Sequence, residues 1–179
     1  MKLKETTIKS TDIFNGKVFK VKYDKILLPD ESEASREVVE HSGGVVIAAI
    51  DEQMNVYLVE QYRYAVKEVV LELPAGKLEP GEDPFEAAVR ELQEETGLLS
   101  EDLKKIGEYY ASPGFCSERL HMYITRKTVM REQNLDQGEF LNVKKMPLSE
   151  AVELVMSDKI KDGKTKALLL MAEKLISLK

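Results

Sequence analysis

The chain has 179 residues, a formal net charge of −6, 43% apolar residues and 32% charged residues. This length suits one domain with a sizeable core, and no apolar run approaches the roughly 20 residues that cross a bilayer. The single cysteine, Cys116, excludes an intrachain disulfide and argues against a cysteine-built metal site. The acidic balance and the lack of a long basic run argue against a nucleic-acid groove. The N-terminus lacks the apolar region of a signal peptide, so the expected location is the cytoplasm.

The residues at the N-terminus, 1–42, predict a β extension that precedes the main domain. Asn15-Gly16 is a turn signal, and the run after it alternates apolar and polar residues as a strand does. The alternation breaks after Lys25, which predicts a bulge or a strand end there. A second strand is expected over 35–43. Two such strands are marginal alone, so we expect them to pack on the main domain or on a partner subunit.

The middle of the chain predicts a series of strands. The first of them is nearly continuous in apolar residues, as a strand covered on both faces would be. The residues of 126–139 are polar without a clear period and are expected to form a loop, whose length favours a functional role. The six expected strands cover residues 43–50, 56–64, 68–76, 103–110, 120–125 and 140–147.

Two helices are predicted at the C-terminus. Ser149 is the expected cap of the first, and the second should run over 164–177 after the turn signal Asp162-Gly163. Strands covered by a few helices indicate an α/β sandwich.

A further helix is expected between Asp83, a good N-cap followed by Pro84, and Gly97, which suits the left-handed position past a helix end. Its apolar residues recur at i, i+3, i+4 and i+7 and predict one buried stripe. The stripe is made of Phe85, Ala88, Val89 and Leu92.

Three glutamates, Glu91, Glu94 and Glu95, are expected off that stripe and close together on the helix surface. Such carboxylates repel one another by about 0.2–0.5 kcal/mol per exposed pair, and the helix dipole disfavours anions in the last turn. Arg90 relieves part of the repulsion through its i, i+4 pairing with Glu94. The remaining negative charge suits a hard cation such as Mg²⁺ or Mn²⁺; the alternative is a solvated acidic face.

The stretch 76–98 resembles the signature of the Nudix hydrolases. The resemblance implies a Nudix-type α/β/α sandwich with a mixed sheet, formed by residues 43–179, and hydrolysis of a diphosphate linked to another group. The sequence fills every fixed place of the signature, with Gly76, Glu82, Arg90, Glu91, Leu92, Glu94, Glu95, Gly97 and Leu98.

Other segments resemble the ADP-ribose pyrophosphatase branch of that family. Pro113 follows Gly97 by sixteen residues, a spacing typical of the branch. The resemblance implies hydrolysis of ADP-ribose to AMP and ribose 5-phosphate. The alternatives are another nucleoside diphosphate derivative, namely a nucleotide sugar or a dinucleoside polyphosphate, and a non-catalytic ADP-ribose sensor. The similar segments are VEQYRY at 59–64, ELPAGKLEPGE at 72–82, LDQGEF at 135–140 and KIKDGKT at 159–165.

The resemblance also implies metal ligands. Glu91 and Glu95 would be the main ligands, Glu94 a ligand or its neighbour, and the carbonyl of Ala75 would complete the site, for Mg²⁺ or alternatively Mn²⁺. Close approach of the backbone at Ala75 requires the glycine that follows it.

Catalytic roles follow from the same resemblance. Arg90 would orient the glutamates through charge-assisted hydrogen bonds, and Glu82 would help to fix the loop. Glu139 is the best match for the general base, with Asp136 and Glu132 as the open alternatives; Glu94 completes the expected catalytic set.

Four residues are expected to bind substrate: Arg63, Arg36, Glu118 and Pro113. A guanidinium fork such as that of Arg63 fits phosphate oxygens, whereas the structural alternative is a surface arginine at a strand end. Glu118 could equally be a solvated turn residue. In the resembling branch the N-terminal strands often form a dimer, so we predict a homodimer in which 1–42 is the dimerisation element.

Overall fold

The structure is a computed structural model that describes residues 2–178. Its backbone contacts divide the chain into two compact units. The first unit contains the residues before Gly44 together with Tyr110–Arg119, and the second contains the rest of the chain. Each unit is described by itself below.

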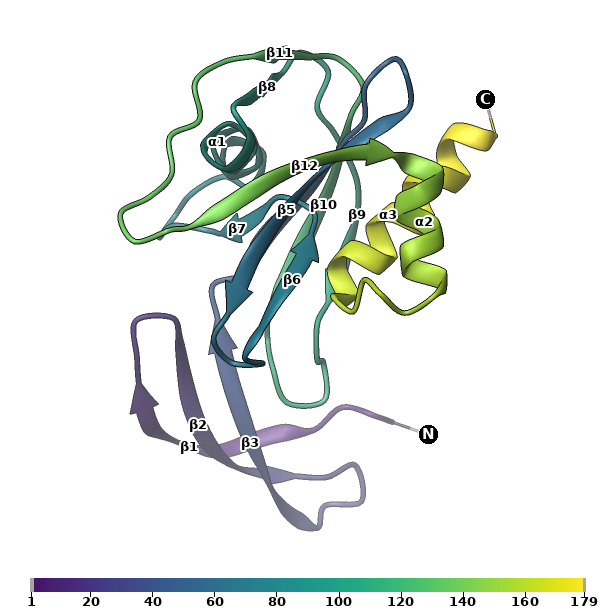
Figure 1. The fold of residues 1–179 in the computed structure, drawn as a ribbon. Coiled ribbons are helices and arrows are strands. Elements are labelled where there is room, and N and C mark those ends of the chain that lie inside the picture. Colours follow the sequence, from purple (N-terminus) through teal and green to yellow (C-terminus); the bar gives the residue numbers. More distant parts are fainter. Residues whose placement is uncertain (1, 179) are drawn as a thin grey trace. The chain divides into compact units, whose positions relative to one another are not determined.

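The first unit is built on an antiparallel sheet in the order β1-β2-β3, made of β1 (Thr6–Asn15), β2 (Phe19–Leu27) and β3 (Glu33–His41) (Figure 1). The expected turn at Asn15-Gly16 joins β1 to β2, and the N–H of Gly16 donates to the carbonyl of Phe19 at 3.1 Å. The predicted strand over 35–43 corresponds to β3. The sequence analysis did not assign β1, whose residues are all exposed and mostly polar.

The structure has an irregularity in strand pairing near Lys25, but it lies on β1, the strand that faces Lys25 of β2. The β1–β2 register shifts between Thr7 and Lys9, which face Ile26 and Lys25. β2 itself continues to Leu27, because its other edge pairs with β3 without interruption. The extra residue therefore belongs to β1, and the prediction that β2 bulges or ends there was wrong.

The second unit contains the remaining strands and all three helices of the described chain. One sheet has the order β7-β4-β10-β9 and another the order β12-β5-β6, and β8 pairs with β11. β4 is parallel to β10 and antiparallel to β7, so the first sheet is mixed. The strands are β4 (Gly44–Ala49), β5 (Asn55–Arg63), β6 (Glu68–Glu72), β7 (Ala75–Lys77), β8 (Leu98–Ser100), β9 (Lys104–Tyr110), β10 (Arg119–Thr125), β11 (Thr128–Met130) and β12 (Leu141–Pro147).

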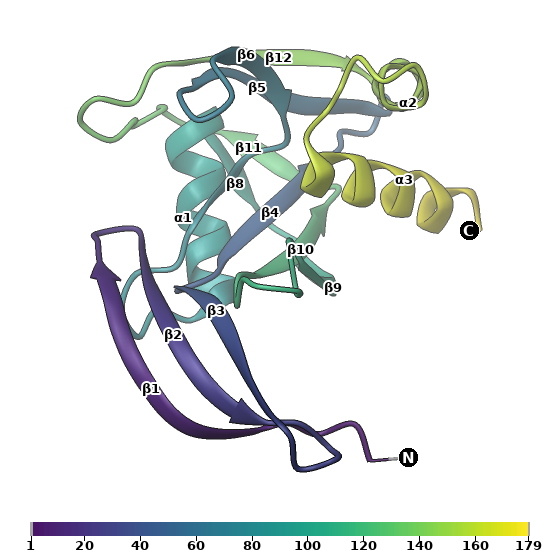
Figure 2. The same ribbon diagram turned by 90° about the horizontal axis from the view of Figure 1, so that it is seen from below.

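β4 is the centre of the core because helices cover both of its faces. Successive side chains of a strand point to opposite sides. Val45, Ile47 and Ala49 pack in one cluster with α1 (Pro84–Thr96), whereas Val46, Ala48 and Ile50 pack in the other with α2 (Leu148–Met156) and α3 (Gly163–Ser177). Figures 1 and 2 show α1 on the side opposite α2 and α3. This arrangement confirms the predicted α/β sandwich.

Three local predictions differ from the structure. The run 68–76 is not one strand but β6 and β7, which end and begin on either side of Leu73-Pro74 and join different sheets; proline lacks the N–H that an inner strand uses. The expected loop 126–139 contains the short strand β11. Ser149 does not cap α2, which begins at Leu148 after Pro147 without a side-chain cap.

Among the helices of residues 2–178, none is both long enough and apolar enough to span a bilayer.

Asp102 connects the turn after β8 to the C-terminal end of β10 through hydrogen bonds. Its Oδ1 accepts from the hydroxyl of Thr125 at 2.6 Å, the N–H of Arg126 at 2.9 Å and the N–H of Lys127 at 3.0 Å. Burial raises the pKa of Asp102, but these donors outweigh burial and hold it below its usual 3.8. The ionised carboxylate therefore stabilises the fold.

We expect Asp102→Ala to lower the free energy of unfolding at pH 7 by about 1–3 kcal/mol, because it removes three hydrogen bonds to a carboxylate, one of them from the buried Thr125. A lowered pKa in the folded state stabilises the protein above the unfolded value, and this stabilisation is lost as the pH falls below 3.8. Urea unfolding at pH 7 and pH 3 should therefore show a smaller difference between wild type and variant at pH 3. Glu101→Ala, at an exposed neighbouring position, is the control.

Candidate active site

Both ends of α1 follow the predicted capping pattern. The side chain of Asp83 accepts from the N–H of Phe85 at 2.8 Å, and Pro84 occupies the first helical turn. Gly97 adopts the left-handed conformation, with φ at 71°. These caps fix where the helix begins and ends, and therefore which residues face the core.

The buried stripe of α1 is rotated from the predicted one. Phe85 is 44% exposed, and its ring packs in a T-shaped arrangement with that of Tyr123, at 6.2 Å between ring centroids. Ala88 and Leu92 are buried as expected, but Glu95 is buried with them, at 2% exposure. Glu95 lies seven residues after Ala88 and so belongs to the same face. The prediction that it lies off the stripe was wrong.

Arg90 gathers three carboxylates around one guanidinium. Its Nε and Nη2 donate to the two oxygens of Glu82 at 2.8 and 3.0 Å. Its Nη1 donates to Glu91 at 2.8 Å and to Glu94 at 2.9 Å. The hydrogen bonds to Glu82, followed by the charge of Glu91, raise the pKa of Arg90. Arg90 thus makes the charge-assisted hydrogen bonds that are needed to orient these three carboxylates.

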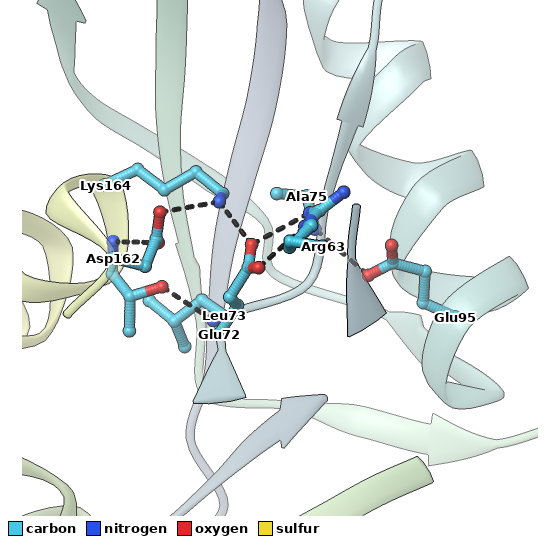
Figure 3. Close-up of polar contacts among 8 residues, drawn as sticks. Arg63, Glu72, Leu73, Ala75, Glu95, Asp162 and Lys164 are labelled. Atoms are coloured by element: carbon cyan, nitrogen blue, oxygen red, sulfur yellow. Dashed lines mark hydrogen bonds and ion pairs between the residues drawn. The ribbon is translucent and has the colours of Figure 1, made fainter. Parts of the chain in front are cut away.

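Glu95 faces the backbone of β7 rather than Arg90. Its Oε2 accepts from the N–H of Ala75 at 3.0 Å (Figure 3). Burial raises the pKa of Glu95 to about 8; the Ala75 N–H opposes this rise, and the charges of Glu91 and Glu139 add to it. Burial also raises the pKa of Glu91. Burial and, to a smaller extent, repulsion between neighbouring carboxylates therefore disfavour the charged forms of Glu91 and Glu95.

Gly76 is the position where a carboxylate lies directly against the backbone. A Cβ built on Gly76 would stand 1.8 Å from the Cδ of Glu91, a distance that only glycine permits. Gly76, the first glycine of the signature, thus leaves room for the carboxylate of Glu91 on α1.

The cluster suits a divalent cation in its donors and in its charge. Carboxylate and carbonyl oxygens are the ligands that Mg²⁺ and Mn²⁺ prefer, and a cation would relieve the raised pKa values of Glu91 and Glu95. Within residues 2–178 no three acidic, histidine or cysteine side chains are gathered as ligands of one ion. The reason is that Arg90 holds Glu91 and Glu94 while Glu95 faces Ala75, so a site here would combine carboxylates with backbone oxygen.

The segment after β11 docks on the C-terminal end of α1. The N–H of Arg131 donates to the carbonyl of Gly97 at 2.6 Å, and the Nε2 of Gln133 donates to the carbonyl of Glu95 at 2.6 Å. These bonds satisfy carbonyls that a helix end leaves open. The docked segment leads to Glu139, whose charge raises the pKa of both Glu91 and Glu95.

The sequence analysis identified neither the role of Gln133 nor the close packing of Arg131 against Gly97. A Cβ at Gly97 would lie 2.8 Å from the carbonyl oxygen of Arg131. The last glycine of the signature therefore serves both the helix end and the docking of the segment that carries Glu139.

Arg63, at the end of β5, is held by a buried carboxylate that the sequence analysis did not identify. Its Nε and Nη2 donate to the two oxygens of Glu72 at 2.7 and 2.8 Å. Lys164 also donates to Glu72, and to Asp162 at 3.0 Å (Figure 3). Burial raises the pKa of Glu72, but Arg63 and Lys164 outweigh burial and lower it.

The remaining predicted substrate residues lie in the first unit. Arg36 on β3 pairs with Glu5, and an oxygen of Glu118 lies 3.6 Å from the Nδ1 of His41. Pro113 lies in a turn closed by Ser112, whose carbonyl accepts from two backbone N–H groups. A groove of about 510 Å³ runs along this sheet, with Arg36 in its lining; the other lining residues are Val21, Ser35, Glu37, Val38, Val39, Gly114 and Phe115.

Comparisons with known proteins relate this chain to one domain family and to several named relatives. Residues 40–169 match the NUDIX domain. The chain is 39% identical to the methanol dehydrogenase activator of Bacillus methanolicus over 90% of this chain and 88% of the relative. It is 38% identical to the ADP-ribose pyrophosphatase of Bacillus subtilis (strain 168), over 91% and 89% of the two chains. It is 32% identical to the GDP-mannose pyrophosphatase of Citrobacter koseri, over 75% of each.

A solved structure of an ADP compounds hydrolase has the same fold. Its TM-score with this chain is 0.86 at 20% sequence identity, and the match covers 99% of this chain and 97% of that one. With a domain match over most of its length and relatives of this identity, the chain belongs to the NUDIX domain family and is a Nudix hydrolase, an enzyme type that works with divalent metal ions.

Proposed function

We propose that this Nudix hydrolase cleaves the diphosphate of ADP-ribose and releases AMP and ribose 5-phosphate. One observation carries the proposal: Glu91 and the buried Glu95 lie against the backbone of Ala75 and Gly76, with Arg63 nearby (Figure 3). Two relatives that share most of this chain's length carry the name ADP-ribose pyrophosphatase, at 38% and 33% identity. They support the choice of substrate.

The ligands that we propose for Mg²⁺, with Mn²⁺ as the alternative ion, are Glu91, Glu95 and the Ala75 carbonyl, with Glu94 as a further ligand or its neighbour. The ion would supply charge neutralisation of the diphosphate and activation of the attacking water.

The protein's own residues would take the other roles. Arg90 holds the glutamates in position, and Glu139 accepts the proton of the attacking water. Arg63, which is 42% exposed, takes up phosphate charge through the donors that Glu72 leaves free.

We further propose that residues 1–42 form a dimerisation element on the hydrolase domain 43–179, with Arg36, Glu118 and Pro113 contributing to substrate binding. Exposed apolar side chains on β1 and β2 support this proposal, because contact with a second subunit would remove their apolar surface from water. They include Ile8, Ile13, Phe14 and Phe19. Light scattering at assay concentration tests it; a monomer would overturn it. The cytoplasm remains the proposed location.

Product analysis tests the reaction. The protein is incubated with ADP-ribose and Mg²⁺, and the products are separated by anion-exchange chromatography. AMP and ribose 5-phosphate should appear in equal amounts, and chelation of the metal should abolish both. Binding of ADP-ribose without hydrolysis, in either Mg²⁺ or Mn²⁺, would instead indicate a sensor.

A nucleotide sugar is the second candidate substrate, because several relatives at 30–32% identity carry the name GDP-mannose pyrophosphatase. A panel of ADP-ribose, GDP-mannose and diadenosine polyphosphate, ranked by kcat/KM, separates the candidates. We expect ADP-ribose to lead by at least about tenfold, a difference of roughly 1.4 kcal/mol in transition-state binding.

A further inference from the structure

We propose that Lys164, at the start of α3, is a positioning residue of the active site: together with Glu72 it holds Arg63 ready for the diphosphate. The inference rests on the proposed function for the ligand that Arg63 meets. It concerns a lysine to which the sequence analysis assigned no role, in a helix that supplies none of the residues proposed above as metal ligand or general base.

The first argument is the geometry around Glu72. This side chain is 2% exposed, whereas that of Arg63 is 42% exposed and that of Lys164 14%. Glu72 accepts from Arg63 with both oxygens, and Lys164 donates to the same oxygen that meets the Nη2 of Arg63. Glu72 thus lies between two cations and is bonded to both (Figure 3), and Arg63 is the more exposed of the two.

The second argument is that the same turn of α3 fixes the backbone leading to β7. The hydroxyl of Thr165, which is fully buried, accepts from the N–H of Leu73 at 2.9 Å. The N–H of Ile47 donates to the carbonyl of Pro74 at 2.9 Å, and the N–H of Ala75 donates to Glu95. Every residue from Glu72 to Ala75 is therefore held by a named partner, and α3 provides the first two contacts.

The third argument is the distribution of charge. A guanidinium has five N–H donors, and Glu72 engages the Nε and one Nη2 donor of Arg63. Lys164 supplies a second cation for Glu72, so this buried carboxylate stays paired when the guanidinium of Arg63 turns toward phosphate. The N–H donors of Arg63 that Glu72 does not engage remain for phosphate oxygens. Asp162 steadies Lys164 and also caps α3 through the N–H of Thr165.

Kinetics of Lys164→Met provide the first test. We expect KM for ADP-ribose to rise about tenfold with kcat changed by less than about threefold, because a binding contact is lost rather than a chemical one. Lys164→Arg should restore KM to within about threefold of wild type. Lys166→Met is the matched control: it lies on the same helix and loses an ion pair with the exposed Asp158, and its KM should not change.

A double-mutant cycle tests whether Lys164 acts through Arg63. In an Arg63→Gln background, Lys164→Met should raise KM by less than about twofold, since the residue that it positions is absent. A full tenfold rise in that background would overturn the proposal. Should Lys164→Met fold poorly, Lys164→Gln, which removes the charge and is one atom shorter but keeps a polar end group, replaces it throughout the cycle.

A measurement without substrate separates this inference from the proposed function. The Nε–H signal of Arg63 is observed by ¹⁵N NMR and assigned by its loss in Arg63→Lys. Its hydrogen exchange should speed up at least about tenfold in Lys164→Met and stay unchanged in Lys166→Met. Unchanged exchange would overturn the proposal that Lys164 helps Glu72 to hold Arg63, whatever the substrate is. Faster exchange with unaltered KM would overturn the link to substrate binding. Failure of wild type to hydrolyse ADP-ribose would contradict only the proposed function.

Discussion

Replacing Glu95 by glutamine is expected to lower kcat at least about 100-fold and to make the metal-free protein more stable. The loss of activity follows from the proposed ligand role, because a metal ligand worth about 3 kcal/mol in the transition state corresponds to that factor. The gain in stability follows from burial. Glutamine has the same shape and can still accept from the N–H of Ala75, but it brings no charge beside Glu91 and Glu139.

The pH dependence of the stability change has a definite sign. The folded pKa of Glu95 is raised to about 8 from the usual 4.5. A raised pKa favours the folded state at low pH, and this advantage is lost as the pH rises from 4.5 through 8. The stabilisation by Glu95→Gln, about 1 kcal/mol or roughly 2–4 °C in Tm, should therefore grow between pH 5 and pH 9 in the presence of a chelator.

Thermal unfolding with and without Mg²⁺, beside steady-state kinetics, checks both parts of this prediction. Glu86→Gln, at an exposed position in the first turn of α1, is the control and should change neither quantity. Full turnover by the Glu95 variant would remove the proposed metal role. A loss of activity with a lower Tm at every pH would mean that Glu95 supports the fold instead.

Local signals were sufficient to predict α1 and its ends. Asp83, Pro84 and Gly97 act within one turn of the helix, so their effect does not depend on distant residues. The stripe was predicted less well, because the apolar ring of Phe85 suggested a buried face that the tertiary structure does not use. Counting from Ala88 and Leu92 would have placed Glu95 on the buried face, at the i+7 position.

Contacts between distant segments could not be predicted from one sequence. Nothing in the local pattern pairs Glu72 with Lys164, although both lie in segments that resemble the family. β8 and β11 have three residues each, too few for a periodic signal. β1 gave no signal for a different reason: its side chains are all exposed, so no apolar face marks it. In each case the deciding interaction is a pairing partner elsewhere in the chain.

Gly76→Ala is expected to lower activity at least about 100-fold while changing the free energy of unfolding by less than about 1 kcal/mol. The added Cβ would overlap the carboxylate of Glu91, with 1.8 Å to its Cδ. That carboxylate ends a flexible side chain, so it can turn away at little cost to the fold. It would then leave the position proposed for a metal ligand, and the lost stabilisation of the transition state is again about 3 kcal/mol.

Gly44→Ala is the matched control, because it alters the facing strand of the same β4–β7 pair. Its Cβ would meet the backbone carbonyl oxygen of Gly76 at 2.4 Å, and a backbone atom cannot turn away. We expect this variant to lose about 1–3 kcal/mol of stability, as overpacked sites do. Urea unfolding, kcat and Mn²⁺ affinity measured on both variants separate the two effects. If Gly76→Ala kept its activity within about threefold, the close approach of Glu91 to β7 would serve packing rather than catalysis.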